Sequence, residues 1–267
     1  MTPFKTQLLG DHVLVTGGNK GIGRVIVESF LAEGANVSYC SRSASEDDFA
    51  TFHGAIEGAK VLGTKVDVGN QEEIRAWVEN SAENYGRIDA VVANAYAIFP
   101  SSSIDDWQQS LEGNTIGLVT LIETAAPYLI ARAGTGSLIV LSSVSGFELR
   151  SSNPTGPQSV VKRSQAIIAK SYSKVLGQKG VRVNTVTPGL VETPNLVRAD
   201  GTEQLSSFQL GKKLKPEFMR GILDQVPLGR PGQSQEVANA VVFLASALSG
   251  YINGANLLID GGFSVTL

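Results

Sequence analysis

The chain of 267 residues contains one cysteine, Cys40, and two histidines, His12 and His53. A single cysteine excludes an internal disulfide and a metal site built from several cysteines. With two histidines, we do not expect a histidine-ligated metal site either. No run of ~18 apolar residues is present, so the sequence predicts no membrane-spanning helix. Because the first residues, MTPFKTQLLG, lack the apolar run typical of a signal peptide, we expect a soluble, cytoplasmic protein.

An excess of positive charge is also missing. The chain has 22 Lys and Arg against 25 Asp and Glu, which gives a net charge of −3. Nucleic-acid partners need a basic surface, so this balance predicts a small-molecule ligand instead. Apolar residues make up 42% of the chain and charged residues 18%, as expected for a globular fold with a substantial core.

Apolar, β-branched runs recur along the chain and alternate with amphipathic segments. The runs cover residues 12–17, 36–42, 60–68, 87–95, 137–143, 181–189 and 256–262. Runs of this kind are typical of strands that are buried on both faces. The alternation predicts an α/β fold: a Rossmann-like, doubly wound, seven-stranded parallel sheet in a three-layer αβα sandwich. We see no linker, so residues 1–267 are expected to form a single domain.

The sequence VTGGNKGIG, Val15–Gly23, follows the first strand and opens the first helix. On its own, a glycine-rich turn is a tight connection between strand and helix. In this context its glycines let backbone N–H groups approach a pyrophosphate at the helix N-terminus. We therefore predict a dinucleotide site. The predicted contacts in this turn are Gly17, Asn19, Lys20, Gly21, Ile22 and Gly23.

The spacing of Gly17, Gly21 and Gly23 resembles that of the short-chain dehydrogenase/reductase family, and the resemblance extends over nearly the whole chain. The family pattern implies further cofactor contacts in later segments. These are Asp67 and Val68 at the adenine, Asn94 and Ala95 in the sequence ANA, and Pro188, Gly189, Val191 and Thr193 at the nicotinamide amide. It also implies catalytic roles for Asn114, Ser143 and Lys162, with Lys162 holding the nicotinamide ribose as well.

The end of the second predicted strand favours NADP(H). In this fold an acidic residue ~20 residues past the glycines binds the ribose 2′-hydroxyl, and an arginine binds a 2′-phosphate. The strand ends in Ser41 and Arg42, with no acidic residue, and Lys20 adds a second cation. The alternative is that Arg42 is an ordinary solvated charge.

The sequence departs from the family pattern at the proton donor. The family carries Y-x-x-x-K in the helix after the catalytic serine. When the lysine is placed on Lys162, the tyrosine position is occupied by Gln158, directly after Pro157. A glutamine donates a hydrogen bond but gives up no proton at neutral pH. Loss of a positioned general acid costs ~10²–10⁴ in rate, so a routine carbonyl reductase is not expected here.

Three functions fit this departure. In the first, NADPH reduces an imine or iminium, which needs no tyrosine proton. In the second, another group such as Tyr96 donates the proton to a carbonyl, although the Tyr96 ring can equally well shape the pocket. In the third, the chain is a non-redox cyclase or a cofactor-bound scaffold. The segments SGFE, KRSQA and VPLGR resemble fungal secondary-metabolism reductases, which include tyrosine-lacking iminium reductases of alkaloids and Diels–Alderases.

Residues 193–230 are long, polar and punctuated by glycine and proline. They leave the carboxyl end of a strand, where ligands bind in this architecture, so we predict a substrate lid. The apolar face of the helix that carries Lys162 permits packing between copies of the chain. Together with the family resemblance, it implies a homodimer or homotetramer.

Overall fold

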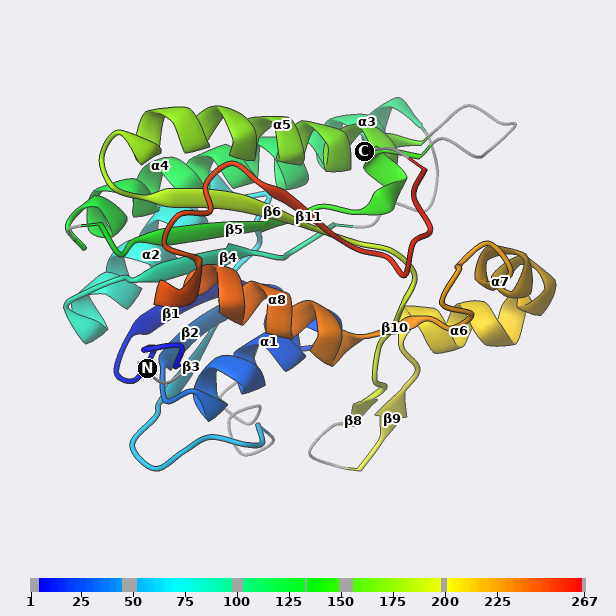
Figure 1. Ribbon diagram of the computed structural model, residues 1–267, viewed down its shortest axis with the longest axis horizontal. Helices are drawn as coiled ribbons and strands as arrows, with labels where there is room; N and C mark the ends of the chain where they lie inside the picture. Colours follow the sequence, from blue (N-terminus) through cyan, green and yellow to red (C-terminus); the bar gives the residue numbers. More distant parts are fainter. Residues whose placement is uncertain are drawn as a thin grey trace.

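The computed structural model describes residues 5–44, 52–97, 103–132, 134–148, 156–197 and 201–265 (Figure 1). One seven-stranded sheet runs through the molecule, and helices cover both of its faces. Its strands are β1 (His12–Thr16), β2 (Asn36–Ser41), β3 (Val61–Lys65), β4 (Ala90–Ala93), β5 (Ser137–Leu141), β6 (Arg182–Pro188) and β11 (Asn256–Ile259). Every strand lies within one of the seven predicted runs and all pair in parallel, so the predicted fold class is confirmed.

Two sets of helices form the outer layers. The first set is α1 (Gly21–Ala32) and α8 (Ser234–Ala245), and the second is α2 (Gln71–Tyr85), α4 (Gly117–Ile130) and α5 (Pro157–Gly177). The short α3 (Ile104–Leu111) leads through a π-helical turn, Glu112–Ile116, into α4. A local signal starts α2, because the Asn70 side chain accepts hydrogen bonds from the N–H groups of Glu72 and Glu73.

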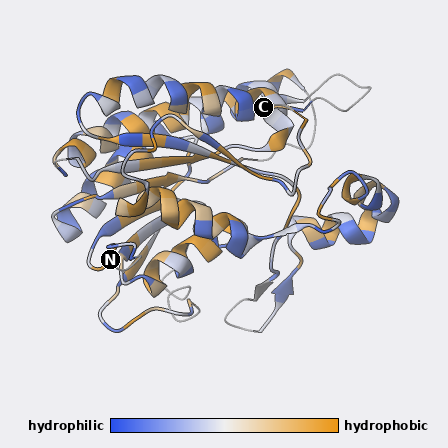
Figure 2. Ribbon diagram, in the orientation of Figure 1, coloured by the Kyte–Doolittle hydropathy of each residue, from blue (hydrophilic) through white to orange (hydrophobic). Residues whose placement is uncertain are grey.

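The strand periodicity divides the core between the two faces of the sheet. In β1, Val13 and Val15 pack with α1 and α8, while Leu14 between them packs with α2 and α4. All three side chains are fully buried. Side chains alternate between faces along a strand, so an all-apolar strand supplies both layers at once. Figure 2 shows the result as hydrophobic colours along the strands and along α8.

The strand order is β11–β6–β5–β4–β1–β2–β3. From β1 the chain builds outward through β2 and β3, and it then returns to place β4 on the other side of β1. The order therefore reverses between β1 and β4. In open α/β sheets ligands bind at the carboxyl ends of the strands on either side of such a reversal. The glycine turn after β1 and the ANA sequence after β4 lie at this point.

The opposite, amino-terminal edge of the sheet carries an ion cluster around one buried carboxylate. Asp89, of which 5% is exposed, accepts hydrogen bonds from Arg87 Nε at 2.6 Å, Arg132 Nε at 2.5 Å and the His12 N–H at 2.8 Å. Arg87 also pairs with Asp11 at 2.8 Å. The cluster ties the start of β1 to the segment before β4 and to the end of α4. It positions the two strands that flank the ligand edge.

The segment predicted as a lid has secondary structure of its own. Its elements are the antiparallel pair β8 (Leu196–Val197) and β9 (Glu203–Gln204), followed by α6 (Ser207–Leu214) and α7 (Pro216–Leu223). A two-stranded parallel pair, β7 (Val191–Glu192) with β10 (Gly232–Gln233), closes its base. Figure 1 shows α6 and α7 set to one side of the sheet. In the described part of the chain no helix is long and apolar enough to cross a membrane.

Candidate active site

The turn after β1 brings bare backbone to the N-terminus of α1. Gly17 and Gly21 adopt left-handed φ angles of 70° and 58°, which side chains with a Cβ rarely accept. A Cβ on Gly23 would lie 2.1 Å from the Gly17 carbonyl oxygen, so only glycine fits there. No side chain caps the start of α1, and its first turn contains no acidic residue. These free N–H groups and the positive end of the helix dipole suit a pyrophosphate.

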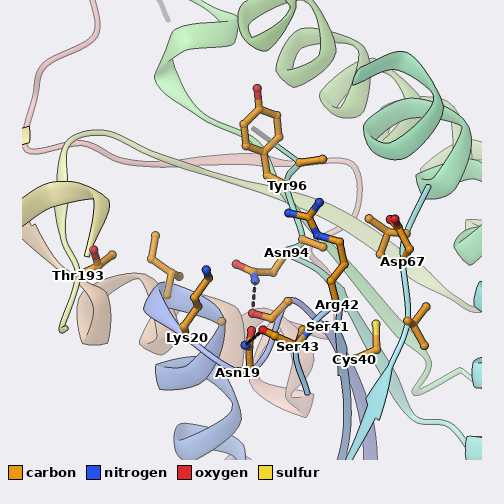
Figure 3. A pocket seen from close by; sticks show the side chains of 17 residues that line it. Asn19, Lys20, Cys40, Ser41, Arg42, Ser43, Asp67, Asn94, Tyr96 and Thr193 are labelled. Carbon is orange, nitrogen blue, oxygen red and sulfur yellow. Dashed lines mark hydrogen bonds between the residues drawn. The ribbon is translucent and has the colours of Figure 1, made fainter. Parts of the chain in front are cut away.

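Thr16 and Asn94 fasten this turn to the loop after β4. Thr16 Oγ1 accepts hydrogen bonds from the N–H groups of Asn94 at 3.0 Å and Ala95 at 2.9 Å. Asn94 Nδ2 donates in return to the Thr16 carbonyl at 2.9 Å and to the Gly17 carbonyl at 3.2 Å. The second of these bonds is drawn in Figure 3. The two loops therefore form one rigid wall.

A pocket of about 370 Å³ lies against this wall. Twelve of the predicted cofactor contacts line it together: Gly17, Asn19, Lys20, Ile22, Gly23, Ser41, Arg42, Asp67, Val68, Asn94, Ala95 and Thr193. Gly21 lies beside it, since a Cβ on Gly21 would be 3.8 Å from Thr193 Cγ2. The structure thus gathers residues from five separate segments around one cavity whose glycine cradle fits a dinucleotide.

The outer end of the pocket is cationic. Lys20 and Arg42 both line it and are exposed, and Figure 3 shows their side chains extending into the same space. Ser43 also lines the pocket, and its hydroxyl accepts a hydrogen bond from Asn19 Nδ2 at 3.0 Å. Asp67 is the one acidic residue among the described lining residues. This end of the pocket is suited to an anion.

Lys162 lies inside α5 with 5% of its surface exposed. Its Nζ donates a hydrogen bond to the Leu141 carbonyl at 2.7 Å, at the end of β5. Burial lowers the pKa of Lys162 to about 7. No carboxylate in the described segments pairs with the amine to offset this effect. The amine is therefore poised between its charged and neutral forms at neutral pH.

Asn114 and Ser143 are already engaged within the protein. Asn114, in the π-helical turn, accepts from the Ala97 N–H at 2.8 Å and donates to the Ala97 carbonyl at 3.1 Å. Its own carbonyl accepts from Gln165 Nε2 at 2.8 Å. The Ser143 hydroxyl accepts from the N–H of Ser145 at 3.2 Å. Asn114 thus shapes the loop that carries Ala97, and Ser143 caps the short turn that follows β5.

Gln158 lies in the first turn of α5, directly after Pro157, which begins the helix. Proline is favoured at this position because the first N–H groups of a helix have no partner within it. Gln158 precedes Lys162 by four residues, which places it on the same side of the helix one turn away. Its side chain is exposed.

Tyr96 approaches Lys162 from the loop after β4. The Lys162 Nζ lies 4.9 Å from the centre of the Tyr96 ring, over its face. Burial raises the pKa of the Tyr96 hydroxyl to about 12, which makes it a poor acid at neutral pH. In Figure 3 this hydroxyl points away from the glycine turn.

Five of the predicted cofactor residues are outside the pocket lining: Gly21, which lies beside it, and Lys162, Pro188, Gly189 and Val191. Pro188 ends β6, and Gly189 packs against Asp260 so closely that a Cβ would lie 2.8 Å from Asp260 Cβ. Val191 is buried in β7. Sequence reasoning did not name Cys40, Ser43, Val66, Tyr96 or Ala97 as cofactor contacts, although they line the same pocket. The first four are each adjacent in sequence to a named residue, and Ala97 is two residues from Ala95, so proximity to the motif was the available signal.

A doubly wound sheet, a glycine cradle at its reversal point and a cationic outer pocket define a nucleotide-binding α/β protein of the oxidoreductase type. A family model described as enoyl-(acyl carrier protein) reductase matches residues 17–264. The chain belongs to the short-chain dehydrogenase/reductase family.

Individual relatives agree with this assignment. The chain is 38% identical to isoepoxydon dehydrogenase patN of Penicillium expansum, with 97% of each chain covered. It is 33% identical to the 3-oxoacyl-[acyl-carrier-protein] reductase FabG of Chlamydia muridarum, with 98% of this chain and 100% of the relative covered. A solved short-chain dehydrogenase/reductase from Serratia marcescens superposes with a TM-score of 0.80 at 28% identity, covering 97% and 99% of the two chains.

Proposed function

We propose that the chain is an NADP(H)-dependent reductase of a biosynthetic intermediate, and that it delivers hydride to an imine or iminium carbon. The observation that carries this proposal is the pair of residues in α5: Lys162 is present, and the position one turn earlier, where the family has a tyrosine, holds Gln158. When bound, reduced nicotinamide supplies a hydride. Hydride addition to an iminium neutralises the cation and forms an amine, so no proton donor is required. A neutral imine must first take a proton from water to become the iminium, because hydride addition alone would leave a nitrogen anion.

We assign the proposed binding roles from the positions of the residues around the pocket. The glycine turn and the N-terminus of α1 hold the pyrophosphate, Asp67 and Val68 contact the adenine, and Lys20 with Arg42 holds the 2′-phosphate. Pro188, Gly189, Val191 and Thr193 hold the nicotinamide amide. Lys162 holds the nicotinamide ribose, and Ser143, Gln158 and Asn114 orient the substrate. Residues 193–230 cover it as a lid, and the active form is a homodimer or homotetramer.

Nucleotide choice is tested by Arg42→Asp. Loss of a charge-assisted hydrogen bond costs about 1.5–3 kcal/mol, so NADPH affinity is expected to fall about 10- to 100-fold. NADH affinity should stay level or rise, because the new carboxylate can accept from a 2′-hydroxyl. Titration of nicotinamide fluorescence measures both constants. Arg75→Asp makes the same change of charge in α2, outside the pocket lining, and controls for net charge.

The missing acid is tested by Gln158→Tyr, with Gln158→Phe as the matched control that adds a ring without a hydroxyl. A restored general acid would raise ketone reduction by ~10²–10⁴ over the Phe variant. For a site built around a cationic substrate, we expect a gain of less than ~10-fold. A gain in the upper range, specific to tyrosine, would show that the enzyme is a carbonyl reductase that lacks only its acid.

A second function, reduction of a carbonyl or oxidation of an alcohol, is favoured by the names of the relatives, a dehydrogenase and a 3-oxoacyl reductase. It needs a substitute proton donor, for which Tyr96 is the candidate closest to Lys162 in the described structure. The raised pKa of its hydroxyl argues against that role. Tyr96→Phe should abolish ketone reduction if Tyr96 is the acid, and should spare iminium reduction if it is not.

A further inference from the structure

Tyr96 and Lys162 come from different elements and meet beside the cofactor pocket. Tyr96 follows β4 and lines the pocket, while Lys162 lies in α5, outside the pocket lining. The separation of 4.9 Å between Nζ and the ring centre lies within the range of a cation–π interaction. Such contacts are strongest where the cation has lost its water, and Lys162 is 5% exposed.

The buried ammonium has few other sources of stabilisation. It can donate three hydrogen bonds, and in the described part of the chain it makes one, to the Leu141 carbonyl. No carboxylate of the described residues lies within ion-pair distance of it. The guanidinium next to it on α5, that of Arg163, lies over a different ring, Phe147, at 4.6 Å. The Tyr96 ring is therefore a main contributor to the stability of the charged lysine.

The ring is held in place from both sides. The preceding residue, Ala95, donates its N–H to Thr16 Oγ1 at 2.9 Å. The following residue, Ala97, exchanges two hydrogen bonds with the Asn114 side chain, at 2.8 and 3.1 Å. With both neighbours fixed, the backbone of Tyr96 has little freedom. Asn114 thereby acts on Lys162 indirectly, through the loop that presents the ring.

We infer that Tyr96 is a positioning residue for Lys162, and that the face of its ring, not its hydroxyl, holds the ammonium group at the cofactor pocket. The contact to NADP(H) in this inference rests on the proposed function, whereas the ring–ammonium contact is a property of the protein alone. Phenylalanine at position 96 should therefore preserve the contact with the Lys162 ammonium, because it keeps the ring face. An aliphatic residue of similar bulk should not preserve it.

The first test uses the protein without nucleotide. Proteins labelled with ¹³C-lysine are titrated by NMR, and the Lys162 signal is assigned by its absence in Lys162→Met. Removal of the ring face in Tyr96→Leu should favour the neutral amine by about 2- to 30-fold and move the titration midpoint to lower pH. Tyr96→Phe should keep the wild-type midpoint. Phe147→Leu, which removes the ring over Arg163, is the matched control and should also keep it.

The second test measures NADPH affinity of the same variants at pH 7. We expect Tyr96→Leu to bind about 2- to 30-fold more weakly and Tyr96→Phe to bind as the wild type does. An unchanged or raised midpoint in Tyr96→Leu, or equal effects of Phe and Leu, would overturn the inference. If the wild type binds no NADPH, the proposed function fails, and the NMR titration still decides the role of Tyr96.

Discussion

Lys162→Met is expected to make the nucleotide-free protein more stable at pH 7 while it weakens NADPH binding about 10- to 100-fold. The lysine is buried, and burial lowers its pKa to about 7. A flexible apolar side chain of similar length fills the same space without a charge to desolvate. We expect a gain of about 1–3 kcal/mol in the free energy of unfolding. The loss in affinity follows from removal of a charged hydrogen-bond donor.

The stability that Lys162→Met gains over the wild type should decrease as the pH rises. In the unfolded chain a lysine holds its proton up to a pH of about 10.4. Between pH 7 and that value, the unfolded wild type binds more protons than the folded one, so its stability rises with pH. The advantage of methionine should therefore be largest at pH 7 and below, and should shrink toward pH 10. Chemical denaturation at pH 7 and pH 9.5 measures this.

Lys174→Met, at an exposed site in the last turn of α5, is the control for the Lys162 experiment. It should change stability by less than about 0.5 kcal/mol at either pH. If Lys162→Met destabilises the protein at pH 7, or if its effect is the same at both pH values, the lysine is not the strained group that the structure shows. A stabilised variant that no longer binds nucleotide would mark Lys162 as a residue kept for function.

Asp89→Ala is expected to lower the free energy of unfolding by about 3–5 kcal/mol at pH 7. The substitution leaves Arg87, Arg132 and the His12 N–H without their shared acceptor. Burial acts to raise the pKa of Asp89, but hydrogen bonds from Arg87 and His12 and the charges of both arginines hold it below its ordinary value. A carboxylate with a lowered pKa stabilises the fold above the unfolded value, and this contribution is lost as the pH falls below about 4.

The test of Asp89→Ala is denaturation at pH 7 and at pH 3.5, with Glu79→Ala on the exposed side of α2 as control. The difference in stability between the variant and the wild type should be largest at pH 7 and should begin to narrow at pH 3.5. The control should stay within about 0.5 kcal/mol of the wild type. A small effect of Asp89→Ala at pH 7 would mean that water replaces the carboxylate at this edge of the sheet.

The sheet and the cofactor turn could be predicted from the sequence because both follow from local rules. Val13, Leu14 and Val15 predict a strand that is buried on both faces, and in the structure all three side chains are fully buried in β1. The glycine positions follow from backbone conformation at Gly17 and Gly21 and from close approach at Gly23. Neither conclusion needs knowledge of distant contacts.

The surroundings of Lys162 could not be predicted, because they depend on packing between distant segments. The sequence placed Tyr96 near the pocket, but only the fold shows that its ring face meets the ammonium. The engagement of the Asn114 carbonyl by Gln165 likewise joins residues 51 positions apart. The helices of the lid were missed because α6 and α7 are short, and their few buried side chains, Phe208 and Met219, give a weak periodic signal.

The central claim is that hydride goes to a carbon that is already electrophilic, so the direct measurement is a competition between substrates. Purified protein is given NADPH deuterated at the transferring position, with a cyclic iminium ion and a ketone of the same carbon skeleton. We predict that NADPH is oxidised with the iminium at least ~100-fold faster than with the ketone, and that deuterium appears in the amine. Faster oxidation with the ketone, or tight NADPH binding with cyclised product and no deuterium transfer, would contradict the account.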